Sequence, residues 1–502
     1  MSEGAKLAVD IGGTFTDLVL ECDGMQHQTK LLTTSAAPEE AVLEGACRIL
    51  GESGTPASAV ELVIHGTTLA TNSLIERKGA KTGLITTEGF RDSVEIAYEH
   101  RFEQYDLYME RPAPLVPRHR RLGVPERVAA DGEVLLALDE GVLIEQARAL
   151  EGEGIEALAI CFLHSYMNAY HERRARDLIT NILPNVAITI SSEVCPEIRE
   201  YERMSTACAN AYVQPMMARY LGELELGLAG IGLTAPLLLM MSSGGITTVE
   251  TASRQPIRLV ESGPAGGAIL ARNIAAQNGL DRVLSFDMGG TTAKITLIDD
   301  CEPLISRSFE VARAYRFMKG SGLPLRIPVI EMVEIGAGGG SIAGLDALRQ
   351  IAVGPRSAGS DPGPACYDRG NEDATVTDAD VVMGRINPAS FAGGKITLAP
   401  EKSETAIAVA IGEPLGLSND IAAAGVDEIV NENMANAARV HAIEHGKDTA
   451  DRTLVAFGGA APLHAARLAD KLGIDRVIVP KGAGVGSAVG FLMAPIGYEV
   501  VR

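Results

Sequence analysis

The chain has 502 residues, of which 44 are Lys or Arg and 65 are Asp or Glu, so its formal net charge is −21. This acidic balance argues against nucleic acid or an anionic membrane surface as a main partner, because both need a clustered basic surface. With 46 % hydrophobic and 22 % charged residues, the composition is that of a globular protein with room for roughly two to four domains.

The chain shows no sign of secretion or of a membrane span. Its seven cysteines are scattered without zinc-finger spacing, which predicts reduced thiols. The amino terminus carries Glu3 and leads directly into a strand pattern, unlike a signal peptide. The most apolar long stretch, residues 477–497, is interrupted by Lys481 and five glycines. We therefore expect a cytoplasmic protein.

Short β-branched runs alternate with helical patterns along the chain, which predicts an α/β fold. The predicted strands are residues 7–9, 16–21, 62–64, 82–86, 157–162, 187–190, 283–286, 295–298, 454–456 and 476–479. The predicted helices are residues 38–51, 169–183, 196–228, 427–445 and 463–472. We expect the longest of them to kink or end at Pro215, because proline removes a helical hydrogen bond.

One motif occurs twice. DIGGT at residues 10–14 follows the first strand, and DMGGT at residues 287–291 follows the strand at 283–286. Each copy has a further β-branched run behind it. The repeat predicts two similar halves. We place their boundary between residues 190 and 205, which divides the chain into residues 1–200 and 201–502.

These two turns have the composition of a phosphate site. Glycines allow backbone N–H groups to face a phosphate without interference from a Cβ, and a threonine adds a hydroxyl donor. An aspartate beside the phosphates can hold Mg²⁺ through water or orient a nucleophile. Hairpin turns use the same dipeptides, but two copies in matching contexts favour phosphate binding. The residues concerned are Asp10, Gly12, Gly13, Thr14, Asp287, Gly289, Gly290 and Thr291.

Three later glycine blocks also follow or precede regular elements. Residues 262–267 precede an alanine-rich helix, so that the helix N-terminus could receive an anion. Residues 334–341, which begin at Glu334, follow an apolar run. Gly458 and Gly459 follow the strand at 454–456, where they suit either a nucleoside or tight packing of a helix on a strand.

The ordered set of motifs resembles the hydantoinase A/5-oxoprolinase family. These are ATP-dependent enzymes with the fold shared by actin, sugar kinases and heat-shock chaperones. The resemblance runs from residue 7 to residue 496. It rests on VDIGGTFTD (9–17), HGTTLATNSLIERKGAKTGLITTEGFRD (65–92), SGPAGG (262–267), FDMGGTTAK (286–294), GAGGGSIA (336–343), GPRSAGSDPGPACY (354–367) and FGGAAPLH (457–464).

The resemblance implies ATP and Mg²⁺ as cofactors, with the two turns as phosphate loops and with Asp10 and Asp287 as catalytic residues that hold Mg²⁺ through water. It also implies that Gly458 and Gly459 lie at the adenosine. Ala461 stands where relatives usually have glycine, which would narrow that slot. The residues implied on the substrate side are His65, Thr67, Thr68 and Glu334, and for His65 a purely structural role in the turn is equally compatible.

The activity implied is phosphorylation of the carbonyl oxygen of a cyclic amide, such as a hydantoin or 5-oxoproline, followed by ring opening. A hydantoinase B-type partner subunit and an oligomer are implied as well. A ketone carboxylase and a non-catalytic ATP-driven remodelling factor are the alternatives. Relatives typically continue into a further C-terminal domain, which we expect this chain to lack.

Two other groups have metal-binding residue types but are better explained structurally. Asp373, Asp378 and Asp380 are spaced as expected for helix capping and turns. His441 and His445 lie one helical turn apart with no third ligand nearby, which fits a helix C-terminus.

Overall fold

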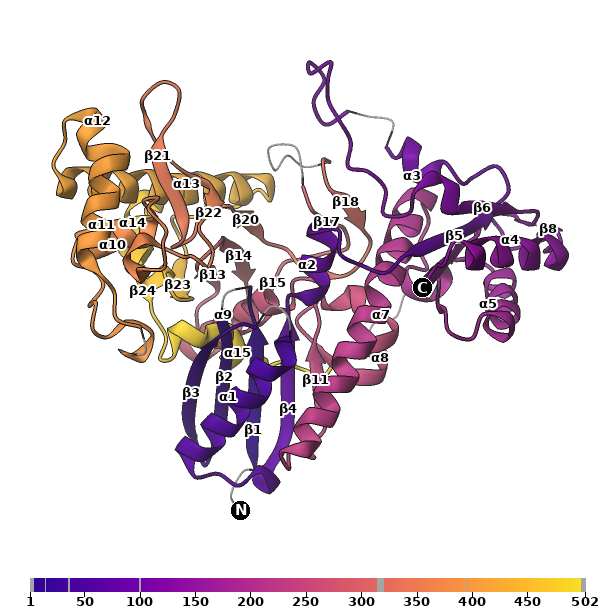
Figure 1. Cartoon of the computed structure of the whole chain (residues 1–502), viewed down its shortest axis with the longest axis horizontal. Coiled ribbons are helices and arrows are strands. Elements are labelled where there is room, and N and C mark those ends of the chain that lie inside the picture. The colour runs from indigo at the N-terminus through magenta and orange to yellow at the C-terminus, as the bar shows by residue number, and fades with distance from the viewer. Residues whose placement is uncertain are drawn as a thin grey trace.

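The computed structural model describes residues 4–13, 15–34, 37–98, 101–313, 320–394 and 396–497. Figure 1 shows three bodies: an indigo one at the bottom, an orange and yellow one at the upper left, and a violet one at the right. Each contains a sheet flanked by helices, which confirms the predicted α/β class.

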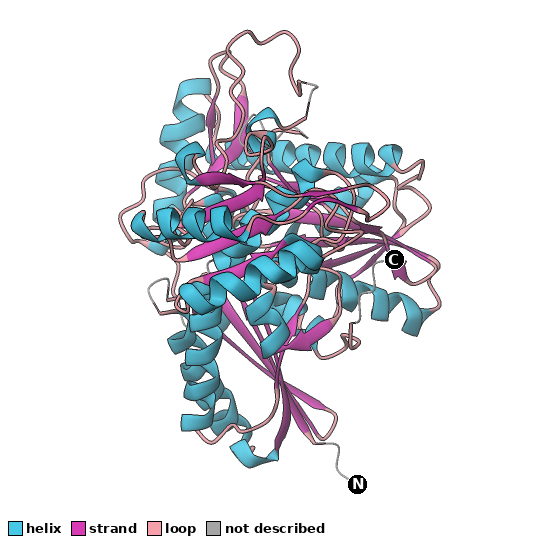
Figure 2. Cartoon of the chain, turned by 90° about the vertical axis from the view of Figure 1, so that its right-hand side faces the viewer, coloured by secondary structure: helices cyan, strands magenta, loops and turns pink. Residues whose placement is uncertain are grey.

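The lower body is a six-stranded sheet. Its strands are β1 (Ala5–Ile11), β2 (Phe15–Cys22), β3 (Met25–Leu32), β4 (Val60–Thr67), β11 (Leu237–Met240) and β12 (Ile246–Thr248). They lie in the order β12-β11-β4-β1-β2-β3, with β1, β2 and β3 as consecutive hairpins and with β4 and β11 parallel to β1. In the side view of Figure 2, helices run along one side of this sheet.

Both faces of β1 are buried, which explains its apolar sequence. Leu7 and Val9 join a core with helices α1 (Pro38–Ser53) and α7 (Glu200–Gly230). Ala8 belongs to a second core on the opposite face. The central strands are therefore held on both sides, and the turn that follows β1 sits on a rigid base.

The upper-left body repeats this arrangement. Its main strands are β13 (Arg282–Met288), β14 (Ala293–Asp299), β15 (Glu302–Pro303), β23 (Thr453–Phe457) and β24 (Arg476–Ile478), with β20 (Val333–Ile335) beside β14. The order β15-β14-β13-β23-β24 again combines antiparallel hairpins with two parallel strands. Two copies of one topology, each with a DxGGT turn after its first strand, confirm the predicted duplicated fold of the actin-like ATPases.

The violet body at the right, which we call the small domain, is a separate parallel sheet. Its strands are β5 (Thr82–Thr87), β6 (Arg121–Val124), β9 (Ala157–Cys161) and β10 (Ala187–Ile190), in the order β10-β9-β5-β6. Helices α4 (Glu140–Gly152) and α5 (Tyr170–Ile182) supply the core on one face, and α7 supplies residues on the other. Three of these strands are at predicted positions, but their separation from the first half was not predicted.

Strands that come after α7 in the chain belong to the lower sheet. After leaving the small domain through α7, the chain returns to the lower sheet, where β11 pairs with β4. Helix α8 (Val249–Arg254) follows and packs against α7, β11 and β12. The sheet of the first half thus includes strands beyond residues 200 and 201, where we predict the division, and α9 (Ser262–Asn278) follows them.

Helix α7 continues through Pro215 to Gly230, so the expectation that it could end there is wrong. Pro215 has no N–H to donate to the carbonyl oxygen of Ala211, four residues earlier. At the next residue, the carbonyl oxygen of Tyr212 accepts a hydrogen bond from the N–H of Ala80, outside the helix (2.8 Å). Val213 and Met217 are fully buried on either side of the proline. Tertiary packing thus maintains the helix despite the proline.

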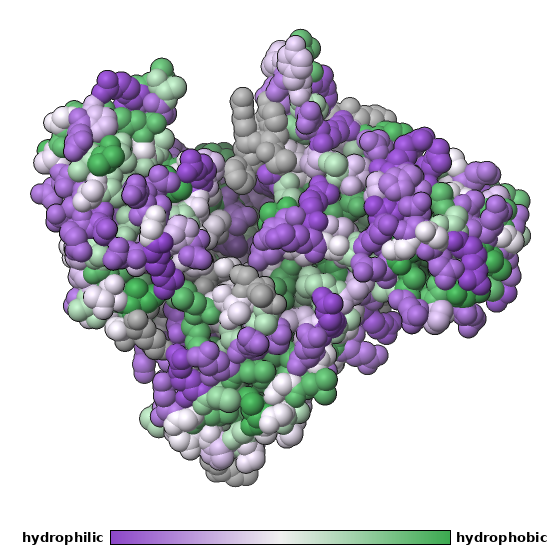
Figure 3. Space-filling model, viewed as in Figure 1, coloured by the Kyte–Doolittle hydropathy of each residue, from purple (hydrophilic) through white to green (hydrophobic). Residues whose placement is uncertain are grey.

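The two halves meet at α9 and α15 (Gly486–Phe491). A Cβ built on Gly490 would lie 1.9 Å from the carbonyl oxygen of Gly266, and one on Gly266 would lie 2.3 Å from the Phe491 ring. Only glycine allows this close approach of the two helices. Figure 3 shows the surface hollowed between the two upper bodies, with hydrophilic residues over much of this face.

The remaining elements flank or join these three bodies. The helices are α2 (Leu69–Ile75), α3 (Ser93–Ile96), α6 (Ser191–Val194), α10 (Val376–Val382), α11 (Pro400–Ile407), α12 (Glu413–Leu415), α13 (Asn419–Glu444) and α14 (Ala461–Leu472). The strands are β7 (Arg127–Val128), β8 (Val134–Leu136), β16 (Ile305–Ser306), β17 (Phe309–Val311), β18 (Leu323–Leu325), β19 (Val329–Ile330), β21 (Ser341–Leu345) and β22 (Ile351–Ser357). Among the described helices, none combines the length and the apolar character that a bilayer crossing requires.

Candidate functional site

The two DxGGT turns have matching hydrogen bonds. The N–H of Gly12 donates to the carbonyl oxygen of Phe15 (2.9 Å), and the N–H of Gly289 donates to that of Thr292 (3.1 Å). Each bond closes the turn between the first two strands of its half. The tips of the turns, including Gly13, are exposed. Thr14 lies outside the described residues.

The tertiary structure brings the aspartates of both turns into one acidic cluster, Asp10, Asp17 and Asp287. The pKa of Asp10 is raised to about 8, chiefly by burial and also by the negative charges of Asp17 and Asp287. The pKa of Asp287 is likewise raised to about 6, chiefly by burial. The positive charge of Lys294 opposes this rise, and the negative charge of Asp17 adds to it. Oδ1 of Asp10 is buried and has no hydrogen-bond partner among the described residues. These features favour a cation that neutralises the cluster.

Two lysines supply positive charge beside the cluster. Nζ of Lys30 lies 2.8 Å from Oδ1 of Asp17. Nζ of Lys294 lies 3.1 Å from Oε2 of Glu261 and 3.6 Å from Oε1 of Glu334. Burial alone would lower the pKa of Lys294, but the two glutamates hold it above its ordinary value. Lys294 is therefore a fixed cation between the halves.

Glu334 reaches the site through the sheet, because β20 pairs with β14 in a register that sets it opposite Lys294. Glu261 precedes α9 with a left-handed backbone, φ 61°, which is uncommon for a residue other than glycine. Sequence reasoning did not identify Asp17, Glu261 or Lys294. The repeated motif could have pointed to two of these residues. Asp17 and Lys294 occupy matching places in TFTD and TTAK, seven residues after the aspartate of each DxGGT motif.

The amino end of α9 adjoins the acidic cluster. A Cβ on Gly263 would lie 3.2 Å from Oδ1 of Asp10. The hydroxyl of Ser262 donates to the carbonyl oxygen of Thr67 and accepts from the Thr67 N–H, each at 3.1 Å. A Cβ on Gly267 would lie 2.5 Å from the Phe457 ring. Gly263 thus lies beside Asp10, and Gly267 both packs on Phe457 and lies beside Asp287, 3.5 Å from its Oδ2 by the same measure.

The glycine block at 336–340 covers the second turn. The N–H of Gly339 donates to the carbonyl oxygen of Gly289 (3.0 Å), and that of Gly340 donates to Gly290 (2.6 Å). A Cβ on Gly338 would lie 2.6 Å from the carbonyl carbon of Thr291. This block therefore supports the turn from behind through its own N–H groups.

Gly458 and Gly459 differ in what they contact. Gly458 has φ 96°, and a Cβ on it would lie 2.5 Å from Oδ1 of Asp287. Glycine is needed there for backbone conformation and for the position of Asp287. A Cβ on Gly459 would meet nothing within 4 Å. Gly459 is exposed, so packing does not require glycine at this position.

The residues predicted on the substrate side are divided between the core and the site. His65 is 1 % exposed, with Nδ1 3.2 Å from the carbonyl oxygen of Val9 and Nε2 2.8 Å from the Tyr220 hydroxyl. Burial lowers the pKa of His65 to about 4, so it is neutral near pH 7. Thr67 is equally buried. The hydroxyl of Thr68 donates to the carbonyl oxygen of Ile11 at the first turn (3.2 Å).

A second set of metal-ligating residue types is an ion-pair network. Asp380, Asp427 and His464 have ligand atoms within 4.8 Å of one another. Arg385 already binds Asp427 through two hydrogen bonds (2.6 and 2.8 Å) and lies 3.2 Å from Asp380. The positive charges of Arg385 and His464 thus balance the negative charges of Asp380 and Asp427, which fits a structural role. Asp378, outside this network, forms a capping box with Thr375 at the start of α10.

The histidine pair of α13 also has structural partners. Nδ1 of His445 lies 2.8 Å from the carbonyl oxygen of His441, and Nε2 lies 3.2 Å from Glu331. These contacts hold the carboxyl end of the helix.

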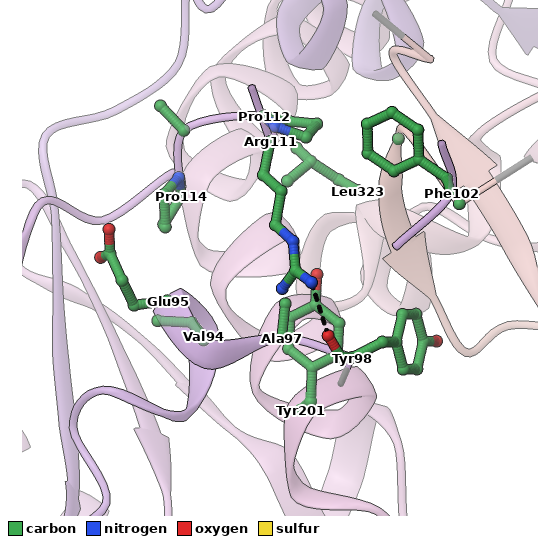
Figure 4. A pocket seen from close by; sticks show the side chains of 13 residues that line it. Val94, Glu95, Ala97, Tyr98, Phe102, Arg111, Pro112, Pro114, Tyr201 and Leu323 are labelled. Carbon is green, nitrogen blue, oxygen red and sulfur yellow. Dashed lines mark hydrogen bonds between the residues drawn. The ribbon is translucent and has the colours of Figure 1, made fainter. Parts of the chain in front are cut away.

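A cavity of about 280 Å³ lies beside α3 (Figure 4). The rings of Tyr98 and Tyr201 pack edge to face in its wall, and Arg111 donates to the backbone carbonyl of Tyr98 (2.8 Å). Phe102 and Leu323 make the opposite wall apolar. None of its lining residues belongs to the acidic cluster.

Comparison with known proteins agrees with the geometry. Residues 203–500 match the hydantoinase/oxoprolinase family, and residues 6–183 match the hydantoinase/oxoprolinase N-terminal region. The chain belongs to the hydantoinase/oxoprolinase family. The three relatives described next are enzymes or subunits of enzymes by name.

Three relatives show which members of the family have similar sequences. It is 36 % identical to caprolactamase subunit alpha of Pseudomonas jessenii (98 % of this chain, 71 % of that one) and 35 % identical to the acetophenone carboxylase gamma subunit of Aromatoleum aromaticum (97 % and 67 %). It is 31 % identical to 5-oxoprolinase of Saccharomyces cerevisiae over 98 % of its length, but spans only 41 % of that protein. The crystal structure of the ATP-dependent caprolactamase superposes with a TM-score of 0.85, covering 98 % of this chain and 71 % of that one at 35 % identity.

Proposed function

We propose that this family member uses ATP to phosphorylate the carbonyl oxygen of a cyclic amide, so that the ring can be opened by water. The observation that carries the proposal is the meeting of Asp10 and Asp287, from two matching glycine turns, in one acidic cluster flanked by fixed lysines. Phosphoryl transfer needs this combination of positioning and charge. The names of the caprolactamase and 5-oxoprolinase relatives support a cyclic amide as substrate.

The chemistry overcomes the low reactivity of an amide. The amide oxygen forms a bond to the γ-phosphorus of ATP as the bond to ADP breaks. Water then adds to the activated carbon, and the carbon–nitrogen bond breaks to give an amine and an acyl phosphate. A second water hydrolyses the acyl phosphate to a carboxylate and inorganic phosphate. ATP hydrolysis thereby drives the ring opening.

In this proposal Asp10 and Asp287 hold Mg²⁺ through water. The unpartnered Oδ1 of Asp10 and the repulsion among the three carboxylates fit a divalent cation. When bound, Mg²⁺ offsets the negative charge of the phosphates. Lys294 would contribute positive charge from the opposite half, held in place by Glu261 and Glu334.

The positions of other predicted residues support the proposal. The exposed turn tips at Gly13, Gly290 and Thr291 would direct their N–H and hydroxyl groups at the phosphates. Gly459 would face the nucleoside. On the substrate side, Thr68 and Glu334 are the predicted residues that reach the site, whereas His65 and Thr67 would support it from within the core.

We further propose a hydantoinase B-type partner that completes the hydrolysis, since the caprolactamase relative is itself named as a subunit. Among the described residues, the cluster of metal-ligating types at Asp380, Asp427 and His464 is already paired with Arg385, so it offers no evident site for activating water.

A ketone carboxylase is the second candidate, because the acetophenone carboxylase gamma subunit is nearly as similar as the caprolactamase subunit. The same ATP site would then phosphorylate an enolate oxygen, and bicarbonate would be required as a co-substrate.

The proposal is tested by measuring phosphate release from ATP with hydantoin, 5-oxoproline, caprolactam and acetophenone, each with and without bicarbonate and a co-encoded partner subunit. We expect release that depends on a cyclic amide and not on bicarbonate. Release that depends on a ketone and bicarbonate would support the carboxylase instead. ATP turnover indifferent to every small molecule would favour a remodelling factor.

A further inference from the structure

Lys294 lies directly opposite Asp287 in the sheet of the second half. The antiparallel register of β13 and β14 pairs the two residues. Side chains at opposite positions of such a pair stand on the same face, with Cβ atoms about 5 Å apart, so opposite charges there attract each other. The strand register by itself therefore favours an ion pair between Lys294 and Asp287.

The ammonium of Lys294 binds elsewhere. Its Nζ lies 3.1 Å from Oε2 of Glu261 and 3.6 Å from Oε1 of Glu334. Among the described residues these are its ion pairs, and Asp287 is not one of them. The side chain of Glu261 is 11 % exposed, whereas that of Glu334 is 53 % exposed. Because water weakens an exposed pair, Glu261 is the carboxylate that determines where the ammonium lies.

The first half has the same arrangement at its matching strands. Asp17 lies opposite Asp10 in the register of β1 and β2, and Lys30 lies opposite Asp17 on β3. Nζ of Lys30 lies 2.8 Å from Oδ1 of Asp17, while Asp10 forms no ion pair within the described part of the chain. In each half, therefore, another carboxylate binds the lysine, and the aspartate of the DxGGT turn is left without one.

Glu261 is held in place by a backbone conformation that glutamate rarely adopts. Its φ of 61° and ψ of 27° lie in the left-handed region. Its N–H donates to Oγ1 of Thr71 in α2 (3.3 Å), and its carbonyl oxygen accepts from the N–H of Ala265 in α9 (3.2 Å). Glycine would adopt this conformation without strain. A glutamate at such a position indicates that its side chain is needed.

We propose that Glu261 is a positioning residue that draws the ammonium of Lys294 away from Asp287. Asp287 then stays available for Mg²⁺, and Lys294 is presented to the phosphate that is transferred. Without Glu261, the lysine would turn to Asp287 and neutralise a carboxylate that the cation needs. This role rests on the proposed function and adds to it a residue that acts through Lys294.

Binding of Mn²⁺ to the full chain, measured from the electron paramagnetic resonance of free Mn²⁺, tests this role without turnover. Wild type, Glu261→Gln, Lys294→Met and the double variant form a cycle. Glu261→Gln should weaken binding by at least about fivefold. Lys294→Met should change the affinity less than about twofold when Glu261 is present. In the Glu261→Gln background it should tighten binding by at least about fivefold, because it removes an ammonium from Asp287.

The cycle separates positioning from the loss of a charge. If Lys294→Met has the same effect in both backgrounds, charge alone is responsible, and the role of Glu261 is overturned while the proposed function stands. A wild-type chain that binds no Mn²⁺ would overturn the metal of the proposed function, and this role with it. Glu302→Gln is the matched control, because it removes a carboxylate that pairs with Arg272 at the far end of the same sheet. It should leave the affinity for Mn²⁺ unchanged.

Glu261→Gly distinguishes the side chain from the backbone. It relieves the positive φ, so it should leave the unfolding temperature within about 2 °C, yet weaken Mn²⁺ binding as much as Glu261→Gln does. A glycine variant with wild-type affinity would overturn the role of the carboxylate. In ATP turnover, Glu261→Gln should lower kcat by at least about tenfold with a smaller change in KM, because a misplaced lysine no longer stabilises the transferred phosphate. A change in KM alone would contradict this role.

Discussion

Asp10 has two neighbouring carboxylates and a buried oxygen, Oδ1, without a hydrogen-bond partner in the described part of the chain. If it handles the charge of Mg²⁺ and phosphate, Asp10→Asn and Asp287→Asn should each lower ATP turnover by at least about a hundredfold. Asp373→Asn, at an exposed aspartate that lies outside the cluster, is the control and should leave turnover unchanged. A folded Asp287→Asn variant with normal turnover would show that the second turn is structural.

Asp10→Asn should also stabilise the protein when no nucleotide is bound. The pKa of Asp10 is raised to about 8 in the folded state, so ionisation is less favourable there than in the unfolded chain. Between pH 4 and pH 8 this cost grows as the pH rises, and Asn removes it. Asp10→Asn should therefore unfold at least about 1 °C higher at pH 8 by scanning fluorimetry, with a smaller gain at pH 5. An equal or lower unfolding temperature at pH 8 would contradict the repulsion inferred here.

Gly458 and Gly459 allow nucleoside access to be tested apart from folding. Gly459→Val enters open space and should weaken ATP binding while leaving pyrophosphate binding and stability nearly unchanged. Gly458→Ala forces a side chain onto a positive φ and against Asp287, so it should destabilise the fold by roughly 1 kcal/mol or more. Calorimetry with both ligands distinguishes the cases. Equal losses of ATP and pyrophosphate in Gly459→Val would exclude a nucleoside slot at that residue.

Helices α10, α13 and α14 are joined by the network of Asp380, Asp427, His464 and Arg385. Burial alone would lower the pKa of His464, but hydrogen bonds to Asp380 and Asp427 raise it to about 9. Its stabilising contribution is therefore complete below about pH 6.5 and is lost as the pH rises through about 9. His464 and Arg385 hold the pKa of Asp427 well below its usual range, against the effect of burial. That contribution is present above about pH 4 and declines in stronger acid.

Urea unfolding at pH 6, 7.5 and 9.5 measures this dependence. The free energy of unfolding should fall between pH 6 and pH 9.5, and His464→Gln should remove most of that slope. His119→Gln, at an exposed histidine, should leave the slope as it is. A slope that persists in His464→Gln would assign the pH dependence to other groups. Zn²⁺ should not raise the unfolding temperature, because Arg385 already occupies the carboxylates.

At the scale of the whole molecule, the described residues include those that we propose hold ATP but no evident site for activating water. We expect the isolated protein to bind ATP with Mg²⁺ but to open cyclic amides slowly until a partner subunit is added. Chromatographic detection of the ring-opened product, with and without the co-encoded partner, measures this difference. Several turnovers per second by the isolated chain would contradict it.

The amino-acid sequence by itself determined the class of the fold, the duplication and the identity of the two turns. Local β-branched runs, glycine blocks and the repeated DxGGT motif are properties of short segments, so they are readable without tertiary information. Its predicted strands at residues 7–9 and 283–286 are confirmed as β1 and β13. The aspartates that follow them converge as the duplication implied, although their roles remain predictions.

Only the tertiary structure decided which segments pair and which charges meet. The lower sheet includes β11, which comes after the long helix α7, because strand pairing depends on partners that are distant in the chain. Lys294 and Glu261 became part of the site through a contact between the halves, and His65 was placed in the core by its bond to Tyr220. Such contacts join residues far apart in the chain, and no local pattern encodes their distance or burial.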